Sequence, residues 1–406
     1  MLKKILMGVS LSALAVTLAY GQAAAPAAGG RAGRGGAGGA AAAGGAGGAG
    51  GAAAAGRGAG GAGGAGGGGS RNLPTDAEWA AFPKTNQYVA RAKIEAGDDK
   101  DLQFDVGIFC KASGGSGNPD RANLGVPEGA PYAAFGAPSP AQHMPAQHMF
   151  DNFWWFGDTG VGSWLVTTPA GYILFDASNN EQEAQEVIVD EMVKNGLDPK
   201  KIKYAIYGHS HFDHTGGGTL IDRIAHPRDI MGPADWDVYL RPAGAGRGAA
   251  PGAAAAPAAA PAPKMKRDID AEDGMKITLG GLTATIYQMT GHTPGSIGMI
   301  VPVKWQGKNH PILIVTAATD VHSREAFIGG YEHIWNIGEA NKVEAVYQVH
   351  PNTNMNFLAR TKYVNDNFAK LQKGGNNPLL YGADKTHRYI EIMRVCTQAR
   401  MDILGW

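Results

Sequence analysis

The sequence has little cysteine, no excess charge of either sign and no long apolar run beyond its first residues. Among its 406 residues are only Cys110 and Cys396, and neither stands beside a histidine or in a Cys-x-x-Cys pair. This argues against a thiolate metal site or a redox centre. In an oxidising compartment the two could form a disulfide between an N-terminal strand and a C-terminal helix. The alternative is a pair of buried thiols.

The missing charge excess limits the partners that the protein can have. Lys plus Arg equals Asp plus Glu at 36 each, so the formal net charge is zero. Proteins that bind nucleic acid or anionic membrane surfaces usually carry a basic excess. We therefore expect a small-molecule partner and no nucleic acid.

The first 21 residues have the three parts of a secretory signal peptide. Lys3 and Lys4 give a positive start, residues 5–19 form an apolar run that is short for a membrane span, and residues 19–21 offer small side chains for cleavage. An uncleaved anchor is the alternative. We expect removal of residues 1–21, no stable membrane span afterwards, and a periplasmic or secreted protein.

Two low-complexity stretches frame the part of the chain that can fold. Residues 22–72 are almost wholly Gly and Ala and predict a disordered tether, because they cannot bury enough apolar surface to fold. Residues 242–263 form an Ala/Pro/Gly insertion, which is surface decoration or, alternatively, a substrate lid. Residues 73–406 are predicted to form one large α/β domain that carries this insertion.

Strand and helix patterns alternate through this domain. Period-two and turn signals predict strands at 104–110, 153–156, 163–168, 172–175, 201–207, 229–232, 275–279, 282–289, 297–303, 311–316 and 343–349. Helices are predicted from a capping box at Thr75, and at 88–95, 181–195, 217–224, 358–372 and 385–403. Residues 111–149 are predicted to be mainly loop. They include His143 and His148, for which a structural role is favoured over a place at an active-site rim.

Four potential metal ligands follow the predicted strand 201–207. They are His209, His211, Asp213 and His214. Residues two apart in an extended segment point the same way, so the first two histidines can bind one ion. The other two follow where the chain turns and can face a second ion. The glycines at 216–218 permit a tight turn with unusual backbone angles.

Two further histidines stand in the same position after other predicted strands. His292 and His350 each follow an apolar strand and precede a turn with Pro or Gly. The six ligands sort into two sites, one of His209, His211 and His292 and one of Asp213, His214 and His350. Nitrogen and oxygen ligands without thiolate suit zinc best, with iron or manganese as alternatives.

An open coordination position at each ion would make these sites catalytic. Zinc lowers the pKa of its water to about 7 and polarises a carbonyl, so two Zn²⁺ ions predict metal-assisted hydrolysis of an acyl bond. Asp213 is the predicted catalytic residue, because it can bind one metal and also hold the nucleophilic water.

These motifs resemble the metallo-beta-lactamase superfamily. The resemblance is carried by His209-x-His211-x-Asp213-His214 with the glycines that follow, by the Gly-His-Thr-Pro-Gly-Ser run that contains His292, and by His350 before a proline. It extends from about residue 150 to the C-terminus. It implies an α+β fold, an αββα four-layer sandwich, with the metals at one edge between two sheets.

Within the superfamily the ligand set is most similar to class B beta-lactamases of subclass three. That resemblance implies an exported zinc enzyme that opens the β-lactam ring of antibiotics by a metal-bound hydroxide. Ser323 matches one of two serines that bind the substrate carboxylate there, while Val321 stands where the other is usual. The alternative is a hydrolase of a lactone, thioester or other ester, in which Asp320 bridges the metals. Otherwise Asp320 is a buried supporting residue.

Overall fold

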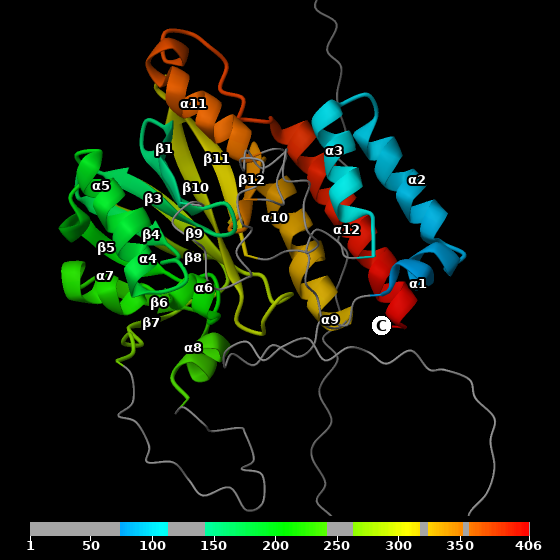
Figure 1. Ribbon diagram of the computed structural model, residues 1–406, viewed down its shortest axis with the longest axis horizontal. Coiled ribbons are helices and arrows are strands. Elements are labelled where there is room, and N and C mark those ends of the chain that lie inside the picture. Colours follow the sequence, from blue (N-terminus) through cyan, green and yellow to red (C-terminus); the bar gives the residue numbers. More distant parts are fainter. Residues whose placement is uncertain (1–73, 113–142, 242–262, 317–323, 352–356, 406) are drawn as a thin grey trace, which may run out of the picture. The chain divides into compact units, whose positions relative to one another are not determined.

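Alternation of apolar side chains along the strands builds two β-sheets that pack face to face (Figure 1). The computed structural model describes residues 74–112, 143–241, 263–316, 324–351 and 357–405. All of them belong to one of the two units into which the chain divides. The predicted signal peptide and tether, and all but the last residue of the 242–263 insertion, lie outside the described residues.

The first sheet has its strands in chain order. Within the described residues it has seven: β1 (His143–Phe150), β2 (Phe153–Asp158), β3 (Gly162–Thr168), β4 (Gly171–Phe175), β5 (Ile202–Ile206), β6 (Arg228–Met231) and β7 (Ile269–Asp270). The pairs from β1 to β4 are antiparallel, and those from β4 to β7 are parallel. Strand β5, which leads into the predicted metal loop, therefore lies inside the sheet.

The second sheet has five strands in the described part of the chain, in the order β12-β11-β10-β9-β8. They are β8 (Met275–Leu279), β9 (Leu282–Gln288), β10 (Ile297–Trp305), β11 (Lys308–Val315) and β12 (Ala345–Gln348). Only the β11–β12 pair among these is parallel. The strands before His292 and His350 thus belong to this sheet.

Side chains on alternate faces of each strand enter different cores. On β3, Trp164 and Val166 pack between the sheets, while Leu165 packs against the helices outside the first sheet. On β11, Ile314 lies between the sheets and Val315 packs against the helices outside the second. This alternation follows from the two-residue period of a strand and requires apolar residues on both faces.

Helices cover the outer face of each sheet. Those outside the first sheet are α4 (Glu181–Ala184), the π-helical turn η3 (Gln185–Val189), α5 (Asp190–Lys194), α7 (Gly218–Ala225) and α8 (Pro233–Tyr239). Those outside the second are α2 (Thr85–Ala96), α3 (Lys100–Phe109), α10 (His333–Ala340) and α12 (Ala383–Leu404). Helix α11 (Phe357–Leu371) adds apolar side chains to the core between the sheets. The predicted αββα sandwich is confirmed.

Short elements complete the chain. They are α1 (Asp76–Ala81), the 3-10 turn η4 (Pro199–Lys201), α6 (Phe212–Thr215), α9 (Arg324–Phe327) and the π-helical turn η5 (Ile328–Glu332). The capping box predicted at Thr75 is present, since the Thr75 side chain accepts from Glu78 N and the Glu78 side chain accepts from Thr75 N. Helices α8, α9 and α10 have no counterpart among the predicted elements.

The prediction of a strand at 104–110 is wrong, because this stretch ends helix α3. The Asp99 side chain caps the helix by accepting from Asp101 N and Leu102 N. Leu102, Val106 and Phe109 recur at helical spacing and are buried in the outer core of the second sheet. The loop predicted to reach residue 149 is also corrected, since strand β1 begins at His143.

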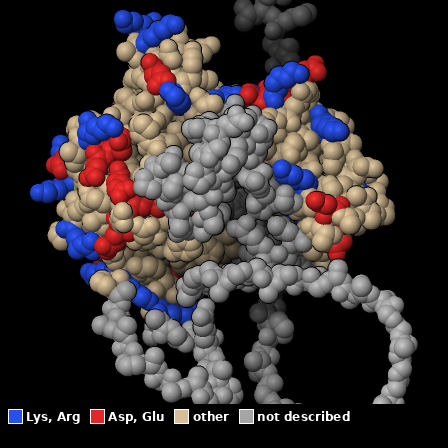
Figure 2. Space-filling view, in the orientation of Figure 1, with Lys and Arg blue, Asp and Glu red and all other residues tan. Residues whose placement is uncertain are grey.

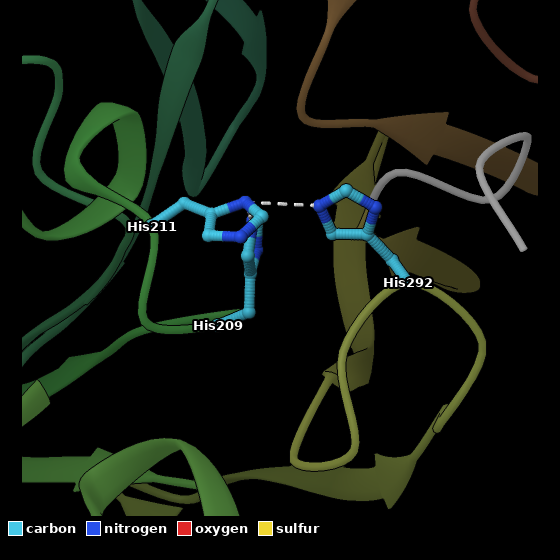
Figure 3. Close-up of side chains that lie close together, drawn as sticks. All are labelled: His209, His211 and His292. Carbon is cyan, nitrogen blue, oxygen red and sulfur yellow. Dashed lines mark hydrogen bonds between the residues drawn. The ribbon is translucent and has the colours of Figure 1, made fainter. Parts of the chain in front are cut away.

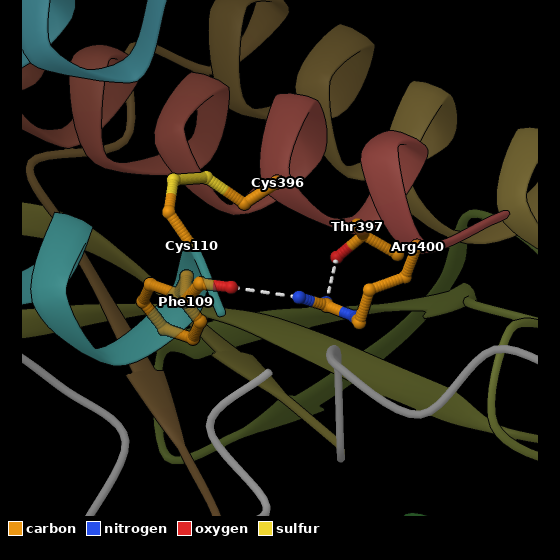
Figure 4. The surroundings of a disulfide bond; sticks show 5 residues. All are labelled: Phe109, Cys110, Cys396, Thr397 and Arg400. Carbon is orange, nitrogen blue, oxygen red and sulfur yellow. Dashed lines mark hydrogen bonds between the residues drawn. A yellow bond between two sulfur atoms is a disulfide. The ribbon is translucent and has the colours of Figure 1, made fainter. Parts of the chain in front are cut away.

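A disulfide joins Cys110, at the end of α3, to Cys396 in α12 (Figure 4). The bond therefore links two helices, and not the strand and helix that the sequence predicted. Beside it, buried Arg400 donates to the Phe109 carbonyl oxygen at 2.7 Å and to Thr397 Oγ1 at 2.7 Å. A covalent link across 286 residues of sequence restricts the unfolded chain, which stabilises the fold.

Candidate metal centre

Three imidazoles from the two sheets converge at one edge of the sandwich (Figure 3). His209 and His211 follow β5 in the first sheet, and His292 follows β9 in the second. His209 Nε2 lies 2.9 Å from His211 Nδ1, and His292 Nε2 lies 3.1 Å from the same atom. A tetrahedral zinc with bonds of 2.0–2.1 Å would separate its nitrogens by about 3.3 Å. These three residues, the three-imidazole group, therefore fit one ion.

A second group lies next to it. Asp213 Oδ2 is 3.2 Å from His214 Nε2 and 3.7 Å from His350 Nε2. The ligand atoms of His209, Asp213 and His214 also lie within 4.8 Å of one another, so the two groups adjoin at His209. All six ligands predicted from sequence are thus brought together from two sheets. Their assignment to separate ions stays a prediction.

Two supporting residues, Asp176 and Gly160, orient the second group, and neither is among the predicted site residues. Asp176 Oδ2 lies 2.8 Å from His214 Nδ1, and Asp176 Oδ1 accepts from Gly208 N at 2.7 Å. The Gly160 carbonyl oxygen lies 2.8 Å from His350 Nδ1. The contacts to His214 and His350 each occupy Nδ1 and leave Nε2 directed at Asp213, as is typical of metal-bound histidine. The sequence signal for Asp176 was its position directly after a predicted strand.

The backbone at Asp176 supports a functional role for this residue. Its φ is +63°, and Ser178 follows with φ +67°, a region that residues other than glycine rarely occupy. Such strain persists where the surrounding structure holds the residue in place, and it concentrates at functional sites.

Burial and the neighbouring groups set the charges of the ligands. Burial, reinforced by the surrounding imidazoles, holds the pKa of His209 and His292 well below the usual range. Burial also lowers the pKa of His350. Neutral imidazoles are the form that binds a metal, so these histidines are prepared for coordination at neutral pH.

The neighbours of Asp213 and His214 favour the charged forms of these two ligands. Burial alone would raise the pKa of Asp213, but His214 and His350 outweigh it and lower that pKa. Burial would likewise lower the pKa of His214, but Asp213 and Asp176 raise it to about 10. A proton thus sits on an imidazole between two carboxylates, where a divalent cation would compete with it.

The glycines after the ligand loop allow close packing. The prediction that they adopt unusual backbone angles is wrong. None of the three at 216–218 has a positive φ. A Cβ on Gly216 would lie 2.1 Å from Asn179 O, and a Cβ on Gly217 would lie 2.2 Å from Ala184 Cβ. The absence of side chains here therefore lets α6 and the start of α7 pack closely against the segment that follows Asp176.

The remaining predicted candidates separate into two classes. Ser323, Asp320 and Val321 lie outside the described residues. His148 is in the fold's interior, stacked between Trp154 and Phe368 with ring centroids 3.9 Å and 3.8 Å away. Burial lowers its pKa to about 4. The favoured structural role of His148 is consistent with this position.

Comparison with known families identifies the part of the chain that carries most of these ligands. Residues 157–303 match the family model described as the metallo-beta-lactamase superfamily. This stretch is a metallo-beta-lactamase domain. It contains five of the six ligands, and His350 follows later in the chain. Members of this superfamily are metal-dependent, so the match and the ligand cluster together describe a metallo-hydrolase.

Solved structures with the metallo-beta-lactamase fold resemble this chain at low identity. The Rm3 metallo-beta-lactamase is 19% identical with a TM-score of 0.50, and the match covers 65% of this chain and 96% of that one. Metallo-beta-lactamase SMB-1, solved with mercaptoacetic acid, is 19% identical with a TM-score of 0.50, covering 64% and 96%. At this identity the likeness shows the fold alone.

Proposed function

We propose that the protein is an exported dinuclear zinc hydrolase that opens the β-lactam ring. The observation that carries the proposal is the complete pair of adjacent ligand groups, one of three imidazoles and one of Asp213, His214 and His350. This set resembles that of subclass-three beta-lactamases. Its nitrogen and oxygen donors, without thiolate, favour zinc.

The residues of the chain have distinct roles in this proposal. Bound zinc would supply Lewis acidity and water of lowered pKa. The three-imidazole group would hold one ion through neutral side chains, while Asp213, His214 and His350 would hold the other with a carboxylate among its ligands. Asp213 would also accept a hydrogen bond from the attacking water, because a low pKa keeps it ionised at neutral pH. Asp176 keeps His214 oriented from behind.

Export is proposed on separate observations. The first 21 residues have the pattern of a signal peptide. The Cys110–Cys396 disulfide is typical of proteins that fold in an oxidising compartment. Among the described residues, no helix is long and apolar enough to cross a bilayer.

A small substrate is proposed in keeping with the balanced charge. On the face drawn in Figure 2, the Lys and Arg side chains are interspersed with Asp and Glu. The chain as a whole has formal net charge zero. A long basic stripe for a nucleic-acid backbone is absent from the described residues of this face.

A lactone, thioester or other ester is the second candidate substrate. Val321 stands where the related enzymes usually have a serine that binds the substrate carboxylate. An apolar side chain cannot replace that hydrogen bond. Ser323 would then be the only member of the pair available for binding a carboxylate.

The test is turnover of a chromogenic cephalosporin by the purified mature protein. We expect two zinc ions per chain by metal analysis, loss of turnover with chelator, and recovery when zinc is restored. His292→Ala should lose activity, whereas His310→Ala is the matched control, since His310 pairs with Glu344 at 2.8 Å and is not among the six ligands. A zinc-loaded protein that opens lactones or thioesters but no β-lactam would contradict the proposed substrate and support the second candidate.

A further inference from the structure

Building on the proposed metal centre, we infer that Asp235 is a positioning residue that sets the spacing of the three-imidazole group. It lies in the first turn of α8, and its side chain reaches both loops that carry these histidines. Asp235 Oδ2 accepts from Ser210 N at 3.1 Å and from Thr293 Oγ1 at 2.6 Å. Neither the superfamily motifs nor the predicted ligand set includes this residue.

The two donors are direct neighbours of the three ligands. Ser210 stands between His209 and His211, and Thr293 follows His292. The first loop leaves the first sheet and the second loop leaves the second sheet. One carboxylate oxygen therefore links loops from both sheets at the residues beside the imidazoles.

The second loop is tied into a small network around this contact. Thr293 Oγ1 also lies 2.7 Å from Ser296 Oγ, and Thr293 N donates to Ser296 Oγ at 2.9 Å. The Ser296 carbonyl oxygen accepts from Met289 N at 2.7 Å, at the end of β9. A displacement of Thr293 would therefore also displace the turn that holds His292.

The start of α8 is fitted closely against this turn. A Cβ on Gly295 would lie 2.6 Å from Asp235 N, and a Cβ on Gly232 would lie 2.0 Å from Gly295 O. Glycine at both positions permits the approach. The helix can therefore place Asp235 between the loops with little freedom to shift.

A structural role confined to α8 does not account for these contacts. An acidic residue in the first turn commonly serves its own helix, by accepting a backbone N–H or by opposing the dipole. Asp235 is fully buried, and its Oδ2 accepts two hydrogen bonds from outside the helix. A buried carboxylate is costly without such partners. The position of Asp235 is explained by the two histidine loops that it connects.

The test measures zinc binding and does not depend on any substrate. Metal-free protein is titrated with zinc against a chromophoric chelator, and the Tm of the metal-free protein is measured alongside. Asp235→Ala should lower zinc affinity about 10- to 100-fold, the usual effect of losing a support of metal ligands. The zinc affinity of Asp235→Asn should lie between those of wild type and Asp235→Ala, since an amide oxygen still accepts hydrogen bonds. Thr293→Val removes one of the two donors and should lower the zinc affinity about tenfold.

Asp237→Ala is the matched control on the same helix, because Asp237 pairs with Arg267 at 2.7 Å on the surface. Its zinc affinity should stay within twofold of wild type. Zinc affinities of Asp235→Asn and Thr293→Val within twofold of wild type would overturn the inference, as would a lower metal-free Tm with unchanged affinity. A wild-type protein that binds zinc but opens no β-lactam would contradict the proposed substrate alone.

Discussion

At the scale of single residues, the two ligand groups differ in charge although they adjoin. In the three-imidazole group, burial holds the pKa of His209 and His292 well below the usual range, which favours their neutral forms. The second group contains an ionised Asp213 beside a protonated His214. Asp213 is the carboxylate of the second group and its lowered pKa keeps it ionised at neutral pH, so its proposed role toward the attacking water is the one to test.

Asp213→Ala should lower kcat at least about 100-fold, since a positioned carboxylate for proton transfer typically contributes that much. The three-imidazole group should still bind zinc, because Asp213 is not part of it. Steady-state kinetics with a chromogenic cephalosporin and metal analysis of the same preparation measure both effects. Asp273→Ala is the control, as Asp273 is half-exposed and pairs with His333. A normal rate in Asp213→Ala would remove this residue from the mechanism.

At the scale of elements, the ligand loop is held by packing against the segment after β4. Gly217 has no room for a side chain, since a Cβ there would lie 2.2 Å from Ala184 Cβ and 2.3 Å from Ala177 O. The backbone on both sides also pairs, with Ala177 N donating to His214 O and Gly217 N donating to Ala177 O. The glycine thus allows α6 and α4 to approach each other at the metal edge.

Gly217→Ala should lower the free energy of unfolding by about 1–3 kcal/mol, as overpacking of a close contact usually does. Gly107→Ala is the matched control, because Gly107 lies in α3 and a Cβ there meets nothing within 4 Å. The control should be neutral or stabilising by up to about 1 kcal/mol through helix propensity. Urea unfolding of the three proteins measures this, and equal effects of both substitutions would contradict the packing explanation.

At the scale of the whole molecule, a buried carboxyl group makes stability depend on pH. Burial and the nearby Asp158 carboxylate raise the pKa of Glu183 to about 8. Ser178 Oγ and Asn179 Nδ2 each donate to Glu183 Oε1 at 2.8 Å. Glu183 therefore lies between Asp158, at the end of β2, and the segment after β4, and its raised pKa favours the protonated form at neutral pH.

The free energy of unfolding should fall as pH rises from about 4.5 to 8. In that window the folded protein keeps a proton on Glu183 that the unfolded chain has released, so the protonated state favours folding at low pH. One such proton gives a slope of at most about 1.4 kcal/mol per pH unit. Glu183→Gln, which resembles the protonated form, should flatten the slope in urea unfolding across this range.

Glu186→Gln is the control for this measurement, since Glu186 lies on the same helical segment and its side chain is partly exposed. It should leave the slope as in wild type. An unchanged slope in Glu183→Gln would assign the pH dependence to another group.

Much of the fold and the ligand cluster could be predicted because their signals are local. Strand periodicity, turn residues and the position of each histidine after a strand are read within a few residues. For this reason the sequence predicts the strands before His209, His292 and His350, and the resemblance implies the αββα sandwich. The strand prediction for residues 104–110 is wrong because β-branched and aromatic residues, which favour strands, also occur in this helix.

The sequence by itself determined which atoms could bind metal, since ligand chemistry is a property of the residue. Tertiary structure alone decided how they meet and what holds them. Asp176 reaches His214 across 38 residues, and Asp235 reaches Thr293 across 58. These partners lie far apart in sequence, so the first contact forms only once β4 and β5 have paired and the second only once the two sheets have packed together.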